Sequence, residues 1–169
     1  MPPKIEEALR RFQEIYLNGI PFLLEQNDTA FLSFLCVMCA TDALAGYRYQ
    51  NLTDPERFKK FVADYFPATY STHAAKLWLF RCRMLHNFSP AHFSLVHGSP
   101  ESHLQVNPAI GDHFLSDVVL FGDLKTATNK YFSELHSNTQ LQRDMLSRLE
   151  NSDRGGAIFV TMNTSETSK

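Results

Sequence analysis

Residues 77–90 of this 169-residue chain read LWLFRCRMLHNFSP, an apolar run interrupted by Arg81, Arg83 and His86. At about 100° per residue, Arg81 falls near the middle of the apolar stripe of a helix. The apolar residues within roughly 60° of it are Ala74, Leu77, Trp78, Met84, Leu85 and Phe88. Burying an unpaired arginine is costly. The stretch therefore predicts a helix whose Arg81 is largely buried and meets an acidic group, a water-filled cleft or a second subunit.

Asp42 is the candidate partner of Arg81. It lies in residues 29–46, TAFLSFLCVMCATDALAG, the most apolar segment of the chain, and shares a helical face there with large apolar side chains. The segment is only marginally long enough to span a membrane and carries polar residues. A central buried helix is therefore favoured over a membrane span, and we expect Asp42 to contact Arg81.

Helical spacing of apolar residues, with caps and stops at the ends, predicts a mainly α protein. Gly19 is expected to end the first helix, and Asp54 is expected to cap the third. The expected helices cover residues 3–19, 27–46, 54–66, 71–89, 112–136 and 139–149.

The apolar period changes after Pro90. The segments HFSLVHG and HLQVN alternate around the turn SPES, so a short β-hairpin is expected over residues 93–107. No internal repeat or low-complexity linker divides the chain, so residues 1–150 are expected to form one domain. Residues 151–169 are expected to be a tail, with a short edge strand at AIFVTMN followed by disorder.

Composition limits the class of function. The formal net charge of −2 gives no general electrostatic attraction to nucleic acid or to an anionic membrane, so a nucleic-acid role needs a local site. The three cysteines do not indicate a secreted disulfide framework, and residues 1–11 do not resemble a secretory signal. We expect a cytoplasmic protein that is not associated with a membrane.

Two further clusters give no strong sign of a metal or cofactor. Cys36 and Cys39 lie three residues apart in an apolar helix, whereas a metal or redox site needs accessible thiolates with activating neighbours. His92, His97 and His103 have no nearby cysteine or carboxylate pair that completes a ligand set, and are interpreted as scattered surface residues. No glycine-rich phosphate loop occurs. We expect neither a metal nor a cofactor.

Arg83 and His86 are three residues apart and share one face of the helix, a cationic pair that suits a phosphate. His86 lies about 140° round the helix from Arg81 and about 7.5 Å along it, so these two can converge only on a shared ligand. The alternative is a solvated polar face at a helix end, where cations interact favourably with the helix dipole.

The segment RCRMLHNF, residues 81–88, resembles the signature of the HEPN superfamily (higher eukaryotes and prokaryotes nucleotide-binding domains): an arginine, four to six residues, then a histidine at a helix end. The segment RFKKFVADYFP, residues 57–67, precedes it as in bacterial and plasmid HEPN proteins. The resemblance covers roughly residues 2–87. It implies a four- or five-helix up-and-down bundle, here with a small β-hairpin before the C-terminal helices, that forms a homodimer.

Active HEPN proteins are metal-independent endoribonucleases, in which the RNA 2′-hydroxyl attacks the adjacent phosphate and leaves a 2′,3′-cyclic phosphate. The resemblance therefore implies that His86 is the general acid or base and that Arg81 stabilises charge on the phosphorane. Arg83 and Asn87 are the candidate RNA- or phosphate-binding residues, and Asp42 supports Arg81. A toxin or defence role follows by the same resemblance, with RNA as ligand and an antitoxin protein as a candidate partner.

Two alternatives to a nuclease stay open. Active members carry a polar residue directly after the arginine, where this chain has Cys82, so a catalytically silent HEPN-type protein that binds RNA or nucleotide is the first. A helical protein-interaction module is the second. Asn87 is equally consistent with a helix-end residue that satisfies backbone carbonyls.

Overall fold

The computed structural model describes residues 1–152 and is mainly helical, as predicted. Residues 153–169, which include the expected edge strand and disordered end, lie outside the described part. The helices are α1 (Pro3–Phe12), α2 (Ile20–Leu24), α3 (Ala30–Arg48), α4 (Asp54–Tyr65), α5 (Ala74–Asn87), α6 (Asp117–Ser137) and α7 (Thr139–Ser152). The strands are β1 (Phe93–Val96) and β2 (His113–Ser116). The HEPN-like bundle topology remains a prediction.

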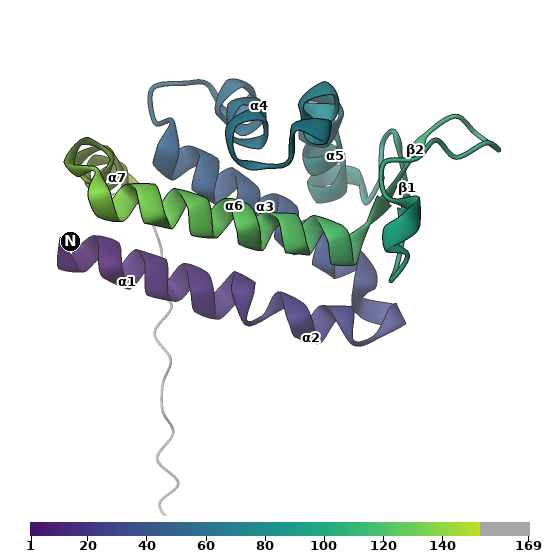
Figure 1. Ribbon diagram of the computed structural model, residues 1–169, viewed down its shortest axis with the longest axis horizontal. Coiled ribbons are helices and arrows are strands. Elements are labelled where there is room, and N and C mark those ends of the chain that lie inside the picture. Colours follow the sequence, from purple (N-terminus) through teal and green to yellow (C-terminus); the bar gives the residue numbers. More distant parts are fainter. Residues whose placement is uncertain (153–169) are drawn as a thin grey trace, which may run out of the picture.

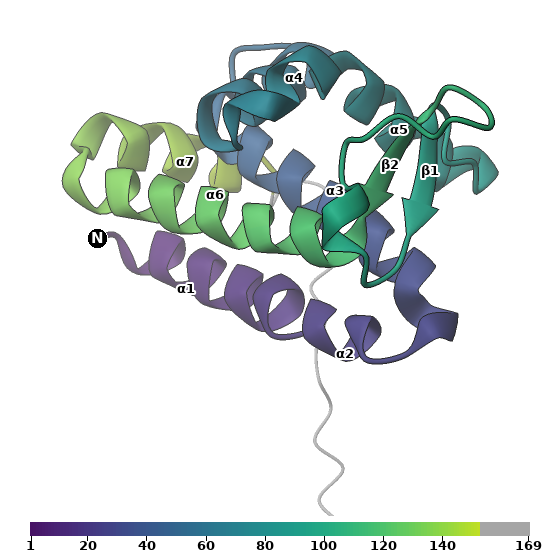
Figure 2. The same cartoon turned by 45° about the vertical axis from the view of Figure 1, so that its right-hand side comes forward.

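Helix α3 is the centre of the molecule, in contact with α2, α4, α5, α6 and α7. Figures 1 and 2 show α1 and α2 along one side of α6, with α4 and α5 on the other. Among residues 1–152, Asn27–Arg48 is the one helix long and apolar enough to cross a membrane, and 56% of its apolar window is buried within the protein. Contacts with neighbouring helices therefore account for its apolar composition.

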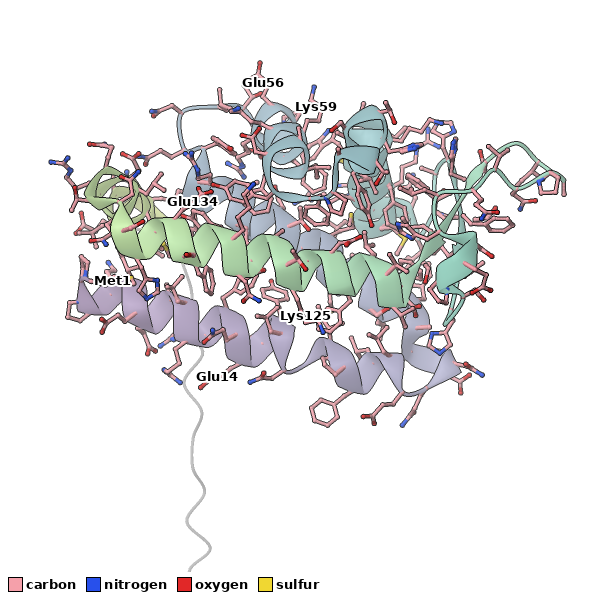
Figure 3. The ribbon with its side chains drawn as sticks, viewed as in Figure 1. Met1, Glu14, Glu56, Lys59, Lys125 and Glu134 are labelled. Carbon is pink, nitrogen blue, oxygen red and sulfur yellow. The ribbon has the colours of Figure 1, made fainter. Side chains whose placement is uncertain are left out.

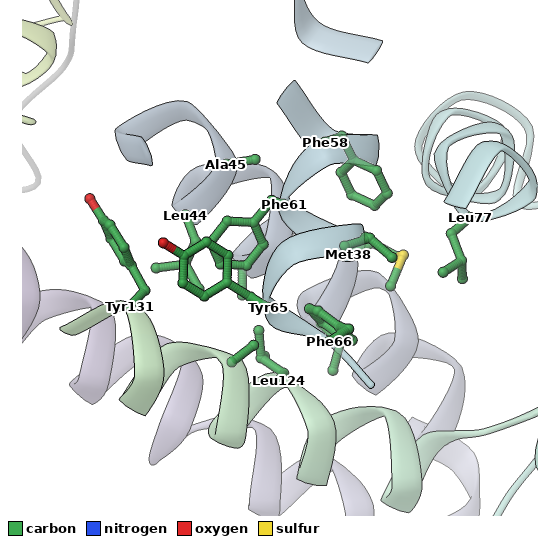
Figure 4. Close-up of a cluster of buried hydrophobic side chains, with 14 of the residues drawn as sticks. Met38, Leu44, Ala45, Phe58, Phe61, Tyr65, Phe66, Leu77, Leu124 and Tyr131 are labelled. Atoms are coloured by element: carbon green, nitrogen blue, oxygen red, sulfur yellow. The ribbon is translucent and has the colours of Figure 1, made fainter. Parts of the chain in front are cut away.

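The core between α3, α4 and α6 is built largely from aromatic rings (Figure 4). Phe61 stacks on Tyr65 of the same helix with ring centroids 4.6 Å apart, and meets Tyr131 of α6 edge-on at 6.2 Å. Phe61 and Tyr131 are fully buried. Burying a large apolar side chain stabilises a fold by about 1.5–3 kcal/mol. This cluster therefore fixes α4 against α6 and α3.

Helix α4 begins with a capping interaction one residue earlier than predicted. The Glu56 carboxylate accepts hydrogen bonds from the Thr53 amide at 3.2 Å and from its hydroxyl at 2.7 Å. Thr53 is thus the cap, and Asp54 is the first helical residue. The prediction that Asp54 caps the helix was wrong because the residue three positions after Thr53 is a glutamate, which completes a capping box.

Gly19 does not end the N-terminal helical segment as predicted. A π-helical turn (Gln13–Leu17) follows α1, and α2 starts directly after Gly19. A Cβ atom at position 19 would lie only 2.3 Å from the Ile15 carbonyl oxygen. The glycine is needed for this close backbone approach, so the chain passes through it rather than stopping.

The predicted hairpin over residues 93–107 was wrong. Strand β1 pairs with β2 in parallel, from Phe93 opposite His113 to Val96 opposite Ser116. Residues 104–106 instead run antiparallel to β2, with hydrogen bonds from Leu104 N to Phe114 O and from Phe114 N to Gln105 O, both 2.8 Å. The chain reverses between them at Gly111, whose φ of +77° favours glycine.

The helix predicted for residues 112–136 begins at Asp117, because the residues before it form β2. Asp117 is 1% exposed and ties this junction to the loop after β1. Its carboxylate accepts hydrogen bonds from the Gly98 amide at 3.1 Å and the Val118 amide at 2.8 Å, and it pairs with the His97 ring. The small sheet is thereby fastened to the start of α6.

Candidate functional site

Helix α5 carries Arg81 along the edge of its buried face. The buried side chains of this helix are Ala74, Leu77, Phe80 and Met84. Leu85 and Phe88, which the sequence placed on the same stripe as Arg81, are exposed. The buried face is therefore centred nearer Leu77 than Arg81, and the guanidinium group reaches the border of the core rather than its middle.

The predicted contact between Arg81 and Asp42 is present. The Arg81 Nη2 atom donates to Asp42 Oδ2 at 2.6 Å, joining α5 to α3. The Arg81 side chain is 22% exposed and the Asp42 side chain 13% exposed. The Trp78 ring lies under the guanidinium group, with its centroid 5.3 Å from Arg81 Cζ, so a cation–π contact adds to the ion pair.

Arg81 and Asp42 belong to the wall of a cavity of about 320 Å³ between α3, α4, α5 and α7, which we call the arginine pocket. Two further arginines reach it, Arg57 from α4 and Arg148 from α7. The residues that line the pocket are Cys39, Asp42, Ala43, Gly46, Tyr47, Arg57, Arg81 and Arg148.

Gly46 on α3 lies beside the side chains of Arg57 and Arg148. A Cβ atom placed on Gly46 would lie 3.7 Å from Arg57 Cζ and 3.9 Å from Arg148 Nε. Both guanidinium groups thus occupy the space beside the glycine, where any larger side chain would project. Because residue 46 is a glycine, this face of α3 has no side chain beside the pocket.

The arginine pocket has more positive than negative charge. Arg57 Nη2 lies 3.8 Å from Asp42 Oδ1, close enough for an ion pair but too far for a hydrogen bond. Arg57 also pairs with Asp54 at 2.9 Å, but the Asp54 side chain is 66% exposed and outside the pocket wall. Within residues 1–152, no carboxylate pairs with Arg148. Asp42 and Asp54 together therefore balance two of the three guanidinium charges.

Two buried donors of the arginines beside the pocket have no partner. The Nε atoms of Arg57 and Arg81 are buried and make no hydrogen bond within the described part of the chain, and Asp42 Oδ1 accepts none. Buried polar groups are usually satisfied, and an unsatisfied one costs about 1–3 kcal/mol. Both Nε atoms have almost no accessible surface, so protein atoms enclose them and they do not face the pocket.

Arg57 is buried although Glu56, directly before it, is exposed. Figure 3 shows Glu56 and Lys59 pointing outward from α4. The Arg57 side chain is 11% exposed, because it precedes Phe58 and lies one turn before Phe61, both fully buried. The apolar face of α4 therefore carries Arg57 into the protein.

The other predicted site residues lie elsewhere. Arg83, His86 and Asn87 are exposed at the C-terminal end of α5 and do not line the arginine pocket. The helix ends there at Phe88, whose φ of 50° is left-handed and whose ring stacks on Phe31 at 6.2 Å. A single chain does not bring His86 and Arg81 to one pocket.

The two cysteines of the CxxC spacing are poor nucleophiles. Burial raises the pKa of the Cys36 thiol, and burial also raises that of Cys39 although Arg81 acts in the opposite direction. Burial likewise raises the pKa of Tyr47, opposed by Arg148. The polar wall of the arginine pocket therefore presents protonated Cys39 and Tyr47 beside its charged groups.

His103 is part of a hydrogen-bonded chain rather than a scattered surface residue as predicted. Its Nδ1 accepts from the Ser116 amide at 3.0 Å, so Nε2 carries the proton and donates to the Tyr70 hydroxyl at 2.7 Å. Tyr70 in turn donates to Asp123 at 2.7 Å. Burial, and secondarily His73, lowers the pKa of His103 to about 4. The chain joins the loop, the turn before α5, and α6.

Sequence reasoning missed Arg57 and Arg148, although a signal was present. Each lies at helical spacing from buried apolar residues: Arg57 is four residues before Phe61, and Arg148 is three residues after Met145. This is the same pattern that singled out Arg81. Only the packing of four helices shows that the three side chains line one pocket.

No family model matches this chain, and no curated protein or solved structure matches it either.

Proposed function

We propose that the protein binds a phosphate group of RNA or of a nucleotide in the arginine pocket, as a HEPN-type nucleic-acid-binding protein. The observation that carries the proposal is the gathering of three arginines from three helices around one pocket, of which Arg148 has no carboxylate partner within residues 1–152. Arginine suits this ligand because its planar donors match phosphate oxygens in a bidentate geometry.

The low net charge of the chain fits a local site. With a formal charge of −2, the protein as a whole does not attract a polyanion, so affinity must come from a few placed cations. The pocket offers them already oriented: Asp42 holds Arg81, and Asp54 holds Arg57. Such preorganisation lowers the entropy lost on binding.

The test is RNA affinity measured by fluorescence anisotropy for Arg57→Gln and Arg148→Gln. Arg143→Gln is the matched control, because Arg143 lies on α7 with Arg148 but is exposed. We expect a loss of about tenfold or more in each pocket variant, which corresponds to one charge-assisted hydrogen bond of ~1.5–3 kcal/mol, and little change in the control. Equal losses in all three variants would indicate non-specific attraction and reject the pocket.

A second candidate function is metal-independent RNA cleavage with His86 as general acid or base. The observation in its favour is that His86 is exposed on the same helix as Arg81, where a polymer can reach it. In this proposal a homodimer packed through α5 brings the two helix ends together. RNA then extends from the arginine pocket of one subunit to His86 of the same subunit or of its partner. Cytoplasmic localisation and an antitoxin partner stay predictions.

A further inference from the structure

We infer that His73, His103 and His113 hold residues 99–112 against the helices near neutral pH, and that protonation of these histidines in acid releases this stretch as a local unit. Residues 99–112, which we call the connecting segment, lie between β1 and β2, and part of the segment extends away from the helices (Figures 1 and 2). The release does not involve the arginine pocket.

Little apolar burial holds the connecting segment in place. None of residues 99–112 is buried, whereas Phe93 in β1 and Leu115 in β2 are. Towards the tip of the segment, Val106 is 56% exposed and Ile110 is 65% exposed. Segments with few buried apolar contacts open at a low cost in free energy while the core stays folded. The polar contacts of the segment therefore decide whether it stays closed.

His103 makes a contact that requires a neutral imidazole. Its Nδ1 accepts a hydrogen bond from the Ser116 amide at 3.0 Å, at the end of β2. Its Nε2 donates to the Tyr70 hydroxyl at 2.7 Å, on the helical side. A protonated ring has two donors and no acceptor, so its Nδ1–H group would point at the Ser116 N–H group. Protonation of His103 therefore turns an attraction between the segment and β2 into a repulsion.

His73 and His113 form a second contact of this kind, at the point where Val106 of the segment bridges to β2. Their ring centroids are 4.5 Å apart, and the Nδ1 atom of each is buried with no hydrogen-bond partner within residues 1–152. A proton on either Nδ1 would be a buried donor without an acceptor, and two charged rings at this distance would repel each other. His73 is also the N-cap residue of α5, where the helix dipole opposes a positive charge.

The surroundings offer little to compensate a positive charge on these rings. The other charged or titratable groups on the segment and on the helical side of the contact are Glu101, Asp112, Tyr70, Lys76 and Asp123. Among the described residues, none of these carboxylates forms an ion pair with any of the three rings. Asp123 reaches His103 only through the Tyr70 hydroxyl. Lys76 adds a positive charge near His73.

The pKa values agree with this geometry. Burial, and secondarily His73, lowers the pKa of His103 to about 4. Burial, followed by His113 and Lys76, lowers the pKa of His73. A histidine in a solvated segment has a pKa of about 6.5. As the pH falls from 6.5 towards 4, the released form therefore binds a proton that the closed form does not, which favours release by up to about tenfold per pH unit.

His97 limits the released unit because its response to acid has the opposite sign. Its ring pairs with Asp117, whose side chain is 0% exposed. A proton on His97 turns this contact into a charge-assisted hydrogen bond, which strengthens it. Asp117 also accepts from the Gly98 amide at 3.1 Å. The chain up to Gly98 therefore stays fastened to the start of α6 in acid, and only the connecting segment is released.

Amide hydrogen exchange of the full-length protein, followed by NMR, tests the release. The readout is the protection factor, the intrinsic exchange rate divided by the observed rate at the same pH. The reporting amides are Leu104, which donates to Phe114 O, and Phe114, which donates to Gln105 O. We expect both protection factors to fall about tenfold between pH 7 and pH 5. They should not change in dilute urea, because a local opening exposes little surface, whereas the protection of buried Leu44 in α3 should fall.

Variants assign the effect to the histidines. His103→Gln does not titrate and should keep most of its protection at pH 5, whereas His92→Ala, at an exposed histidine, should respond to pH as the wild type does. His73→Asn, which keeps a favourable N-cap residue, should show a smaller pH effect and decides the question if His103→Gln loosens the segment at pH 7. Protection that is independent of pH, that falls equally in the wild type and both variants, or that falls with urea in parallel with Leu44 would overturn the inference.

Discussion

Arg81 on α5 donates a hydrogen bond of 2.6 Å to Asp42 on α3, and this contact sets the position of the first of three guanidinium groups in the arginine pocket. Asp42 faces Arg57 from the other side at 3.8 Å. One carboxylate thus positions two arginines from two helices beside the pocket.

Replacing Asp42 should make the stability of the protein depend on a bound anion in place of the lost carboxylate. We expect Asp42→Asn to lower the free energy of unfolding by about 3 kcal/mol, the lower end of what breaking a buried ion pair costs. Because sulfate can take the place of the lost charge, it should stabilise the variant more than the wild type. Thermal unfolding over a sulfate series measures both effects. Equal sulfate stabilisation of the two proteins would mean that the anion does not enter the pocket.

His86→Ala separates RNA binding from RNA cleavage. His86 is exposed, so its loss should leave stability nearly unchanged. If the protein cleaves RNA, turnover should fall by ~10²–10⁴-fold while RNA still binds, because a general acid or base contributes about that much. Cleavage of labelled RNA, assayed with and without EDTA, provides the readout, and His92→Ala is the control at another exposed histidine. Activity that survives His86→Ala would eliminate this residue from the mechanism.

The predicted homodimer should depend on the apolar end of α5. Phe88 is 70% exposed there and stacks on Phe31, which suits a second copy of the same surface. We expect wild-type protein to scatter light with twice the monomer mass at micromolar concentration, and Phe88→Glu to be monomeric. Phe22→Glu on α2, a side chain 69% exposed, should leave the dimer intact. A monomeric wild type would refute the dimer.

Acid should weaken the fold through His103. Burial lowers its pKa to about 4, compared with about 6.5 in the unfolded chain. Between these values the unfolded chain binds a proton that folded His103 does not, so stability falls as the pH drops from 6.5 towards 4. Because the ring is partly exposed, the loss from His103 is on the order of 1 kcal/mol. The raised pKa of Asp123, caused by burial, acts in the opposite direction.

The contribution of His103 is isolated by comparing urea unfolding of the wild type and His103→Gln at pH 7 and pH 5. Glutamine can keep polar contacts near Tyr70 and Ser116 but does not titrate. The wild type should lose more stability between the two pH values than the variant does. If both lose the same amount, the acid sensitivity originates elsewhere, for example at His73, whose pKa is also lowered by burial.

A structural feature of this protein could be predicted from sequence where neighbouring residues encode it, and not where it depends on distant residues. The Arg81–Asp42 contact was predictable because each residue stands out against the apolar face of its own helix. Strand β2 was missed because HFLS, before DVVLF, is equally consistent with the first turn of a helix. Its parallel pairing with β1 depends on residues twenty positions away, and no local pattern encodes that partner.

The arginine pocket likewise could not be predicted from local sequence patterns. Arg57 and Arg148 are ninety-one residues apart in sequence, and both line one pocket beside Gly46. Gly46 was noted in the sequence merely as the end of a helix, yet α3 continues to Arg48. Without the fold, nothing connects a glycine on one helix with arginines on two others.

The most direct test of the central claim is the NMR signal of the arginine Nε–H groups, recorded while an RNA hexamer with a terminal phosphate is added. The account predicts that the signals of Arg57 and Arg81 shift together and saturate, because the phosphate binds beside both guanidinium groups, and that the signal of exposed Arg143 stays in place. Binding of the hexamer with unchanged Arg57 and Arg81 signals would contradict the claim that the arginine pocket holds the phosphate.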